Sequence, residues 1–390
     1  MENPMATANS EFIRTKFSPP KLPPPKLPPD FPHLKTTVRK SGTPRRRRRS
    51  DTWVVSVFVI IQIGVFIATM LVNDCWTNSH GDCALSFLGK LSFQPLHENP
   101  LLGPSQSKLD EMGALRRAFL TKYHQTWRLF TFPFLHAGLF HLLINLSSVI
   151  YVGIHLEQEF GSLRIGIIYT LSAFMGALVA ALFVQSTPAV GSSGALYGLL
   201  GTLLSELIWN REFRINKVSE IVSSVLIFVC NFILGFLPYV DNFSSIGGFI
   251  SGFLLGSVLI LSPQLPQVAP SKGGLIDYGV KSYIKLKLKQ KLDRPVLRIV
   301  SLFLFSLMLA GFLVAVLHGI NINSYCTWCP YVDCIPSTSW HCKDRETICE
   351  TMVSNEHMTM TCMDNGNFRI FPFTNISLAR VNDLCNLICF

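Results

Sequence analysis

The sequence predicts an all-α polytopic membrane protein, as its composition and its long apolar runs indicate. Of its 390 residues, 49% are hydrophobic and 15% are charged, against about 25% charged in an ordinary soluble domain. Seven apolar runs are long enough to cross a bilayer. Because backbone groups in hydrocarbon must pair within their own segment, each run is expected to be a helix. The runs cover 54–72, 134–154, 165–184, 190–209, 221–237, 243–261 and 299–317.

Residues 1–53 form a basic, proline-rich tail that we expect to be disordered and cytosolic. Residues 1–50 hold twelve Lys and Arg against three Asp and Glu, which accounts for +9 of the net charge of +10. Lys-Leu-Pro-Pro repeats at Lys21 and Lys26, a pattern typical of extended linkers or of ligands for SH3-like and WW-like partners. Since the charge belongs to one tail and not to a folded face, a nucleic-acid-binding domain is excluded.

The first span, 54–72, directly follows this tail and its five arginines Arg45–Arg49. The run is too long and too far from the start for a cleaved signal peptide. The weakest span is 221–237, which has 17 residues and contains Asn231. The Gly and Ser residues within the spans are normal for packed membrane helices. Together the spans define a seven-helix membrane domain, 54–318.

Lys and Arg in the short loops predict the orientation, because positive residues stay on the cytosolic side. With the N-terminal tail cytosolic, the loop 210–217 with three Lys and Arg, and the loop 272–298 with eight, are cytosolic too. The loop 73–128 is also basic, but loops of that length are weak topology signals. An odd number of spans then places the tail 319–390 on the lumenal or extracellular side.

Cysteines support the same orientation, because eight of the eleven lie after residue 320 and Cys75 and Cys83 fall on the same side. An even number outside the reducing cytosol predicts disulfides and leaves roughly a hundred pairings open. A zinc knuckle on Cys326-x-x-Cys329 is the competing interpretation, but no second pair completes it, so no metal site is expected. The eight are Cys326, Cys329, Cys334, Cys342, Cys349, Cys362, Cys385 and Cys389.

The compartment follows from the same tail. Disulfides and the sequon Asn375-Ile-Ser377 favour the secretory pathway, in the endoplasmic reticulum, Golgi or plasma membrane. The basic, acid-poor N-terminal tail also fits an organellar transit peptide, so an organellar membrane stays open as the alternative.

Two polar motifs lie within the apolar spans. Gly191-Ser192-Ser193-Gly194 opens the run at 190–209, and His141 and Asn145 lie four residues apart, on one helix face, in the run at 134–154. Small residues such as Gly194 also serve helix packing alone. Polar groups at membrane depth, however, usually face a protein interior or an aqueous cavity. The two motifs therefore indicate a candidate site.

These residues resemble the rhomboid family of intramembrane serine proteases, and in particular plant rhomboid-like proteins with a seventh helix and a Cys-rich tail. The resemblance runs from about residue 124 to the end. It implies a six-helix core plus one C-terminal membrane helix, a Ser/His dyad, and no cofactor. The matching motifs, in order, are Trp127-Arg128, His141-x-x-x-Asn145, Glu157 with Gly161, Gly191-Ser192-Ser193-Gly194, and Tyr197 one turn on.

The resemblance also implies roles for individual residues. Ser193 would be the nucleophile, and His141 and Asn145 would stabilise the oxyanion together with the backbone N–H of the nucleophile. The departure is at the general base. Where the family has a histidine, in a form such as Asp-Asn-Phe-Ala-His-x-Gly-Gly-Phe, this chain has Ser245 within Asp241-Asn-Phe-Ser-Ser-Ile-Gly-Gly-Phe249.

A serine cannot accept the proton of the nucleophile near neutral pH, so Ser193 lacks its activator. Ser245, Gly248, Gly252 and Gly256 share a helix face that is expected to pack on the run at 190–209. We therefore predict an inactive rhomboid-type protease, a pseudoprotease, that binds single-pass or polytopic membrane-protein clients.

Two other functions stay open. The first is an active serine endopeptidase that uses Ser193 with a non-standard base, for which His136, His141 and His318 are candidates. The second is a carrier or channel, for which the sequence offers no buried charge pair or inverted repeat.

Overall fold

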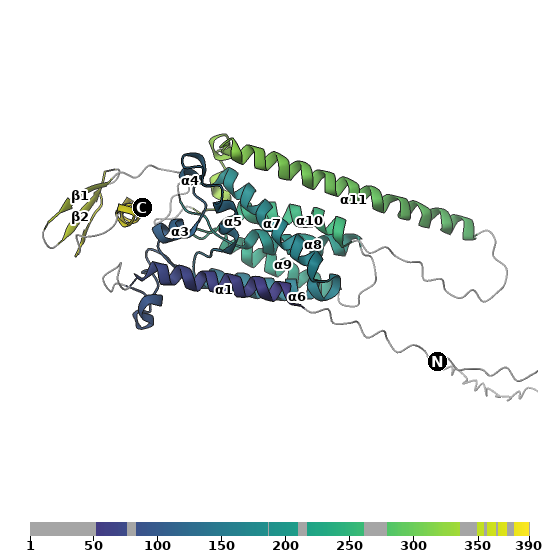
Figure 1. Cartoon of the computed structure of the whole chain (residues 1–390), viewed down its shortest axis with the longest axis horizontal. Helices are drawn as coiled ribbons and strands as arrows, with labels where there is room; N and C mark the ends of the chain where they lie inside the picture. The colour runs from purple at the N-terminus through teal and green to yellow at the C-terminus, as the bar shows by residue number, and fades with distance from the viewer. Residues whose placement is uncertain are drawn as a thin grey trace, which may run out of the picture. The chain divides into compact units, whose positions relative to one another are not determined.

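The computed structural model describes residues 52–75, 83–185, 187–209, 217–260, 279–335, 349–354, 357–363, 366–372 and 378–389. The predicted disordered tail, apart from its last two residues, lies outside these ranges, as do Cys342 and the sequon at Asn375. The described chain is mostly helical, with one small sheet near the C-terminus (Figure 1).

One long helix lies at each of the seven predicted spans. Four of them, α1, α6, α7 and α10, together with the segment Pro295–Leu317 of α11, have the length and composition to cross a membrane, while α9 is a shorter apolar helix. The seven are α1 (Val54–Asn73), α6 (Leu139–Phe160), α7 (Ser162–Phe183), α8 (Ser193–Trp209), α9 (Lys217–Leu234), α10 (Asn242–Leu259) and α11 (Gly279–Leu317).

Helix α8 is the centre of the membrane part. Thirteen of its 17 residues are buried, among them the polar residues Ser193 and Thr202. It packs against α7 and α10, and its apolar side chains form one core with α6 and α7. A helix surrounded in this way is shielded from lipid, so it can be short and rich in small residues.

Glycines bring the backbones of α8 and α10 into direct contact. A Cβ at Gly248 would lie 2.0 Å from the carbonyl oxygen of Gly194, and a Cβ at Gly252 would lie 2.0 Å from that of Gly198. Both pairs differ by 54 residues, since 248 − 194 and 252 − 198 give the same number, so the two helices run parallel in a fixed register. This confirms that the Gly-rich face of α10 packs on α8, as small residues in membrane helices do.

The second span begins later than the sequence predicts. Residues 128–134 form α5 (Arg128–Thr131) and η2 (Phe132–Phe134), and α6 begins only at Leu139. Gly138 is fully extended, with φ 178° and ψ 177°, and a Cβ there would lie 2.2 Å from the carbonyl oxygen of Leu101. Hydropathy does not detect this break, because the residues on both sides of it are apolar.

Glu157 on α6 fixes the start of α1. Its two carboxylate oxygens accept the N–H groups of Val54 and Val55 at 2.9 and 3.0 Å. These N–H groups have no partner within the helix, and a carboxylate at a helix N-terminus also interacts favourably with the helix dipole. The predicted motif residue Glu157 therefore joins two membrane helices.

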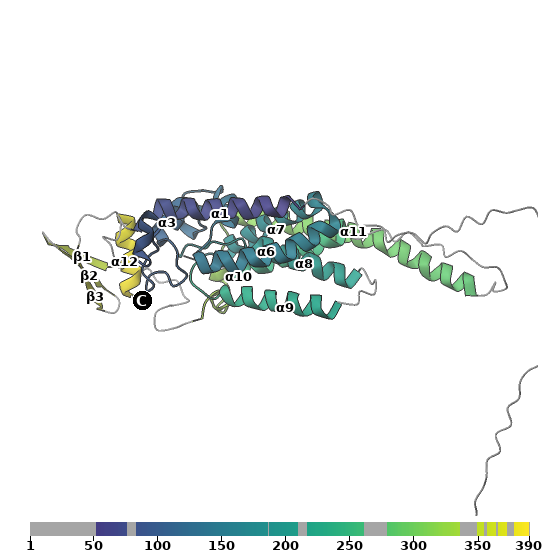
Figure 2. The same ribbon diagram turned by 90° about the horizontal axis from the view of Figure 1, so that it is seen from below.

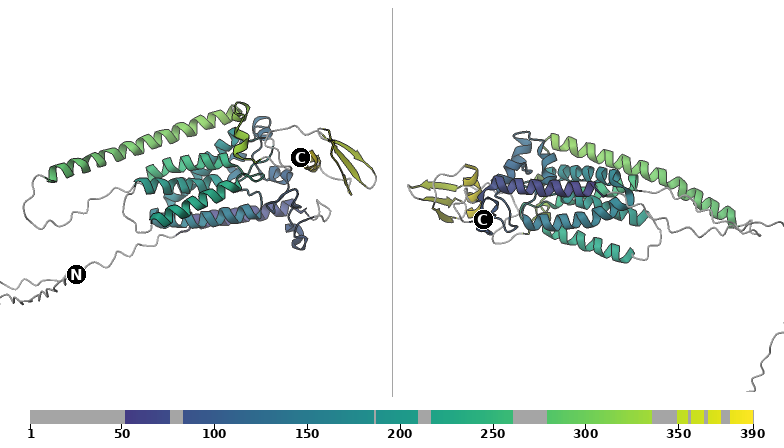
Figure 3. Two further views of the ribbon diagram at one scale, coloured as in Figure 1. Left: turned by 180° about the vertical axis from the view of Figure 1, so that it is seen from behind. Right: turned by 60° about the horizontal axis from the view of Figure 1, so that its bottom comes forward.

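Helices α9 and α11 lie at the periphery. Helix α11 runs along α7 and α10 (Figure 3), and many of its apolar side chains, such as Ile299 and Phe303, are exposed. Helix α9 contacts α6 and α8 and exposes Val222 and Leu226. These are the surfaces that a bilayer would cover.

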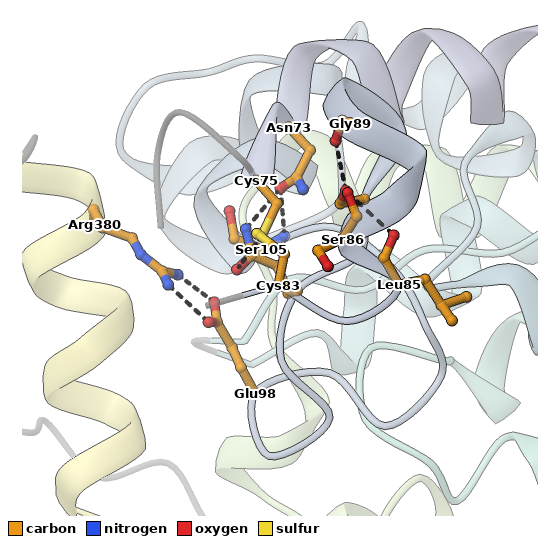
Figure 4. Close-up of a disulfide and its surroundings, with 11 residues drawn as sticks. Asn73, Cys75, Cys83, Leu85, Ser86, Gly89, Glu98, Ser105 and Arg380 are labelled. Atoms are coloured by element: carbon orange, nitrogen blue, oxygen red, sulfur yellow. Dashed lines mark hydrogen bonds and ion pairs between the residues drawn. A yellow bond between two sulfur atoms is a disulfide. The ribbon is translucent and has the colours of Figure 1, made fainter. Parts of the chain in front are cut away.

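The loop between α1 and α6 contains short helices that pack over the ends of the membrane helices. They are η1 (Ser86–Leu91), α3 (Gln106–Met112) and α4 (Arg117–Thr121). The loop begins with a disulfide between Cys75 and Cys83, on the side of the fold where sequence analysis placed the Cys-rich tail (Figure 4).

The membrane part is all-α as the sequence predicts, and the C-terminal tail adds a small sheet. Strands β1 (Cys349–Val353), β2 (Met358–Cys362) and β3 (Phe368–Phe371) form an antiparallel sheet in the order β1-β2-β3. Helix α12 (Leu378–Cys389) lies between this sheet and α3 (Figure 2). The alternating buried residues of β2, namely Met358, Met360 and Cys362, form a small core with Leu384 and Ile388.

Disulfides hold the tail together, as the sequence predicts. Cys349–Cys385 joins β1 to α12, and Cys362–Cys389 joins β2 to α12. Cys326–Cys329 closes a tight loop after α11, so the residues of the alternative zinc knuckle form a disulfide instead. Cys334 is disulfide-bonded as well, and Cys230 on α9 is a free thiol.

Candidate active site

Ser193 is the first residue of α8, and the turn before it depends on Gly191. Gly191 has a φ of 149°, a conformation that side chains disfavour. A Cβ on Gly191 would lie 3.6 Å from Ser193 Oγ and 3.6 Å from Nε2 of His141. The turn therefore brings the imidazole of His141 and the hydroxyl of Ser193 to the same side of one glycine.

The hydroxyl of Ser193 donates a hydrogen bond to the main-chain carbonyl of Asp241 at 3.4 Å. Asp241 is the N-cap of α10, and its carboxylate accepts the N–H of Ser244 at 2.6 Å. In an α-helix the N-cap carbonyl also accepts the N–H four residues later, which is that of Ser245. Ser193 therefore contacts the turn of α10 that carries Ser245.

The packing of α10 on α8 gives the same placement. Ser245 lies one turn before Gly248 on α10, and the register of 54 residues, continued back by one turn, predicts that it lies towards the Gly191 turn. Ser245 is 1% exposed and Ser193 is 4% exposed. The position predicted for the missing general base is therefore buried, on the turn of α10 that Ser193 contacts, and it carries a hydroxyl group.

A hydrogen-bond chain links the two polar motifs. The hydroxyl of Ser192 donates to Oδ1 of Asn145 at 2.8 Å and lies 3.1 Å from Nε2 of His136. Because the Ser192 proton goes to Asn145, Nε2 of His136 is the donor in the second bond. All three side chains are buried. The contact between Asn145 and Ser192 joins two different spans. Spacing within one span cannot predict it, so the sequence indicates a role for Asn145 but none for Ser192.

His141 is oriented by the turn that precedes α6. The N–H of Ala137 donates to Nδ1 of His141 at 3.4 Å. In a neutral imidazole the other nitrogen, Nε2, then carries the proton. Since Nε2 is the nitrogen near Gly191, His141 directs a donor towards the Ser193 turn. That arrangement suits stabilisation of an oxyanion, the role that the resemblance implied.

Tyr197 has a structural partner on α9. Its hydroxyl donates to the main-chain carbonyl of Phe228 at 2.7 Å, and the two rings meet edge to face with centroids 4.9 Å apart. Asn231 on α9 also donates to Ser148 of α6 at 2.9 Å. Tyr197 therefore connects the Ser193 helix to a peripheral helix.

The three histidines considered as alternative bases either form hydrogen bonds to other groups or are exposed. His136 bonds Ser192 and not Ser193, and His141 accepts at Nδ1 from the main chain. His318 is exposed, after the end of α11. The carboxyl group nearest to Ser193 in these contacts is that of Asp241, and burial raises its pKa to about 6, while hydrogen bonds from the N–H groups of Ser244 and Phe243 act in the opposite direction.

Trp127-Arg128 organises the loop above the site. Nη1 of Arg128 donates to the carbonyls of Asp110 and Ala114, both at 2.7 Å, and the guanidinium lies 3.9 Å from the ring centroid of Phe119. These contacts hold α3 and α4 together. In this structure the motif therefore fixes the conformation of the loop above the site.

Within the described residues, one cluster has the spacing of metal ligands. The Sγ atoms of Cys349, Cys385 and Cys389 lie within 4.8 Å of one another. All three belong to disulfides, so they are not thiolates that could hold a metal ion.

Three features define the class of protein. They are the buried serine at the start of a central helix, the oxyanion-type donors, and the partner helix packed on it through glycines. This is the fold of an intramembrane serine protease. The rhomboid domain model matches residues 123–262.

The chain belongs to the rhomboid family. It is 52% identical over 310 residues to Inactive RHOMBOID-like protein 8 of Arabidopsis thaliana, covering 79% of this chain and 88% of that protein. It is 42% identical over 340 residues to RHOMBOID-like protein 1 of the same plant, covering 86% and 85%. RHOMBOID-like protein 6, mitochondrial, also of Arabidopsis, is 39% identical over 307 residues, covering 76% and 97%.

Proposed function

We propose that this rhomboid is a pseudoprotease, which binds membrane-protein clients and does not cleave them. The observation that carries the proposal is the hydrogen bond from the Ser193 hydroxyl to the Asp241 carbonyl, beside a serine at the base position. A main-chain carbonyl does not take up a proton near neutral pH, so this contact satisfies the hydroxyl without activating it.

The size of the expected effect supports the proposal. Loss of the catalytic histidine in a soluble serine protease costs on the order of 10⁶ in turnover. The donors at His141 and the Ser193 turn remain, but they stabilise an oxyanion only after the serine has attacked. The name of the relative at 52% identity, an inactive RHOMBOID-like protein, agrees with this function.

Client binding is supported by the preserved scaffold. The Gly191 turn, the Ser192–Asn145 bond and the contact of α8 with α10 are all kept in a chain without a base. A site that no longer performs chemistry can still present the surface on which the membrane segment of a client lies.

The orientation and compartment form part of the proposal. The described disulfides all lie in the two segments that the predicted orientation puts opposite the basic N-terminal tail, and disulfides persist in oxidising compartments. We propose a secretory-pathway membrane with the C-terminal tail lumenal. Protease protection of sealed microsomes tests the orientation, and digestion of the C-terminal tail from outside the vesicle would contradict it. Fluorescent tagging tests the compartment, and co-localisation with mitochondria would support the organellar alternative.

Two experiments test the function. A fluorophosphonate probe should fail to label Ser193 under conditions in which an active rhomboid is labelled. In co-immunoprecipitation with single-pass membrane proteins that an active rhomboid cleaves, the wild type and Ser193→Ala should capture the intact client equally, because the hydroxyl is not needed for binding. Labelling of Ser193, or capture of cleaved fragments by the wild type alone, would favour the second function, an active endopeptidase with Asp241 or a histidine as its base.

A further inference from the structure

The loop after α11 is fixed to the membrane core at both of its ends. At its start, the side-chain amides of Asn321 and Asn323 donate to the carbonyls of Val184 and Phe183, which end α7. At its finish, Asp333 accepts the N–H of Asn242 at 2.8 Å, at the start of α10. The loop therefore has a defined conformation relative to two membrane helices, which is the usual setting of a functional loop on a rigid scaffold.

The centre of this loop carries the disulfide Cys326–Cys329, and its two cysteines differ in accessibility. Cys329 is 4% exposed and packs with Val179 and Phe243 of α7 and α10. Cys326 is partly exposed. Cys326 also packs against this cluster, but it is the more exposed of the two cysteines. It is therefore the one that an attacking thiolate meets first, with Cys329 as the sulfur that leaves.

Two large aromatic residues that are exposed flank Cys326 in the sequence. Tyr325 is 87% exposed and Trp328 is 67% exposed, one directly before and one two residues after Cys326. Aromatic residues at the centre of a recognition surface contribute binding energy at low entropic cost.

The other described disulfides have a different character. Cys349–Cys385 and Cys362–Cys389 connect residues 36 and 27 positions apart and hold β1 and β2 to α12. Cys75–Cys83 connects residues 8 positions apart at the start of the loop after α1. Cys326–Cys329 connects residues only three apart, so it removes the least entropy from the unfolded chain and is the weakest as a structural link.

We propose that Cys326–Cys329 is a thiol–disulfide exchange site whose substrate is a protein or peptide dithiol. A thiolate of the substrate attacks Sγ of Cys326. The Cys326–Cys329 bond breaks, a mixed disulfide forms, and Cys329 takes a proton as it becomes a thiol. The second thiolate of the substrate then attacks its own sulfur in the mixed disulfide and releases Cys326.

The electron balance is that of a two-electron oxidation. The substrate dithiol becomes a disulfide, and the cysteine pair becomes a dithiol. Oxidised glutathione, a low-molecular-weight disulfide, restores the pair and is itself reduced to two molecules of glutathione. The inference is independent of the state of Ser193, and it does not depend on the pseudoprotease proposal.

The first test uses the wild-type full-length protein in detergent. It is equilibrated in glutathione buffers of increasing reducing strength, the thiols are alkylated, and each cysteine pair is quantified by mass spectrometry. For each disulfide we compare the glutathione ratio at which half of the molecules are reduced. For Cys326–Cys329 this ratio should be at least tenfold less reducing than the ratio for Cys349–Cys385 or Cys362–Cys389. Reduction of all pairs together, or of Cys326–Cys329 last, would overturn the proposal.

The second test uses a matched pair of variants, each of which keeps one cysteine of the Cys326–Cys329 pair as a free thiol. With oxidised glutathione as the probe, Cys329→Ser should acquire one glutathione at Cys326 at least tenfold faster than Cys326→Ser acquires one at Cys329. The wild type, in catalytic amount, should accelerate oxidation of a peptide dithiol by oxidised glutathione, and neither variant should. Equal rates in the variants, or no acceleration by the wild type, would show that the disulfide is structural.

Discussion

Arg380 of α12 and Glu98 of the loop after α1 form a two-point ion pair, although 282 residues separate them. Nη2 of Arg380 lies 2.8 Å from Oε2 of Glu98, and Nη1 bonds Oε1 (Figure 4). Asp383, one turn on, accepts the N–H of Ser107 at 3.1 Å, at the start of α3. The Cys-rich tail is therefore docked on the loop above the membrane helices by charged groups that are nearly buried.

The first prediction concerns this docking. Arg380→Met leaves Glu98 buried without its partner, which should destabilise the docked tail by about 3 kcal/mol. Hydrogen exchange of α12 and the rate of proteolysis in the tail measure the effect. The double change Arg380→Met with Glu98→Leu should cost less than the single change, because Glu98 is then not left as a buried charge without its partner. A single variant with wild-type protection of α12 would contradict the role of the ion pair.

The second prediction is a pH dependence centred on Asp110. Burial raises the pKa of Asp110 to about 7, although Arg116 and Arg128 act in the opposite direction, and Asp383 adds to the increase. Burial also raises the pKa of Asp383 itself. With a folded pKa above the ordinary 3.8, the native state binds the proton more tightly, so its stabilising contribution is present at low pH and is lost as the pH rises through about 7.

The melting temperature in detergent should therefore fall as the pH rises from about 4 to about 7 and level off above about 7. Asp110→Asn, which mimics the protonated group, should flatten this slope. Glu111→Gln is the control, because Glu111 is exposed and pairs only with Lys108 in the described contacts. The interpretation fails if the slope is the same in Asp110→Asn and the wild type.

The third prediction concerns the contact of α8 with α10. Gly248→Ala places a methyl group where the carbonyl of Gly194 lies, and should cost about 1–3 kcal/mol through forced separation of the helices. Gly64→Ala and Gly311→Ala are matched controls, since a Cβ at either position meets nothing within 4 Å. Thermal unfolding that is unchanged in Gly248→Ala would show that the helices are further apart than described.

The fourth prediction concerns cysteine oxidation. When the protein is denatured and alkylated before reduction, Cys230 should be the labelled residue among the cysteines that the structure describes. The faster migration of unreduced protein on electrophoresis provides an independent check. Labelling at Cys349, Cys362, Cys385 or Cys389, or stoichiometric zinc in purified protein, would refute the disulfides of the tail.

The sequence predicts the membrane helices well because bilayer thickness and hydropathy determine their length. The boundary of the second helix was wrong, since Pro133 and Gly138 interrupt an apolar run without changing its hydropathy. The sheet in the tail was missed, although the alternation of Met358, Met360 and Cys362 carries its signal. These strands are short, and the cysteines dominate the interpretation of that region.

For the site, the sequence indicates which residues are polar within the spans, and the resemblance supplies roles for them. The roles of Ser193, Ser245, His141 and Asn145 stay predictions, while the structure shows their positions. Spacing along one helix could not reveal that Asn145 meets Ser192, or that Ser193 meets the carbonyl of Asp241, because those contacts depend on how separate helices pack.

The most direct test of the central claim is cleavage of a rhomboid model substrate by purified protein in lipid vesicles. Cleavage is measured for the wild type, Ser193→Ala, Ser245→His and the double variant Ser193→Ala with Ser245→His. We expect no cleavage by the wild type, and weak cleavage by Ser245→His that the added Ser193→Ala abolishes, because a base at position 245 can then accept the serine proton. Cleavage by the wild type that is lost in Ser193→Ala would contradict the account and identify an active protease.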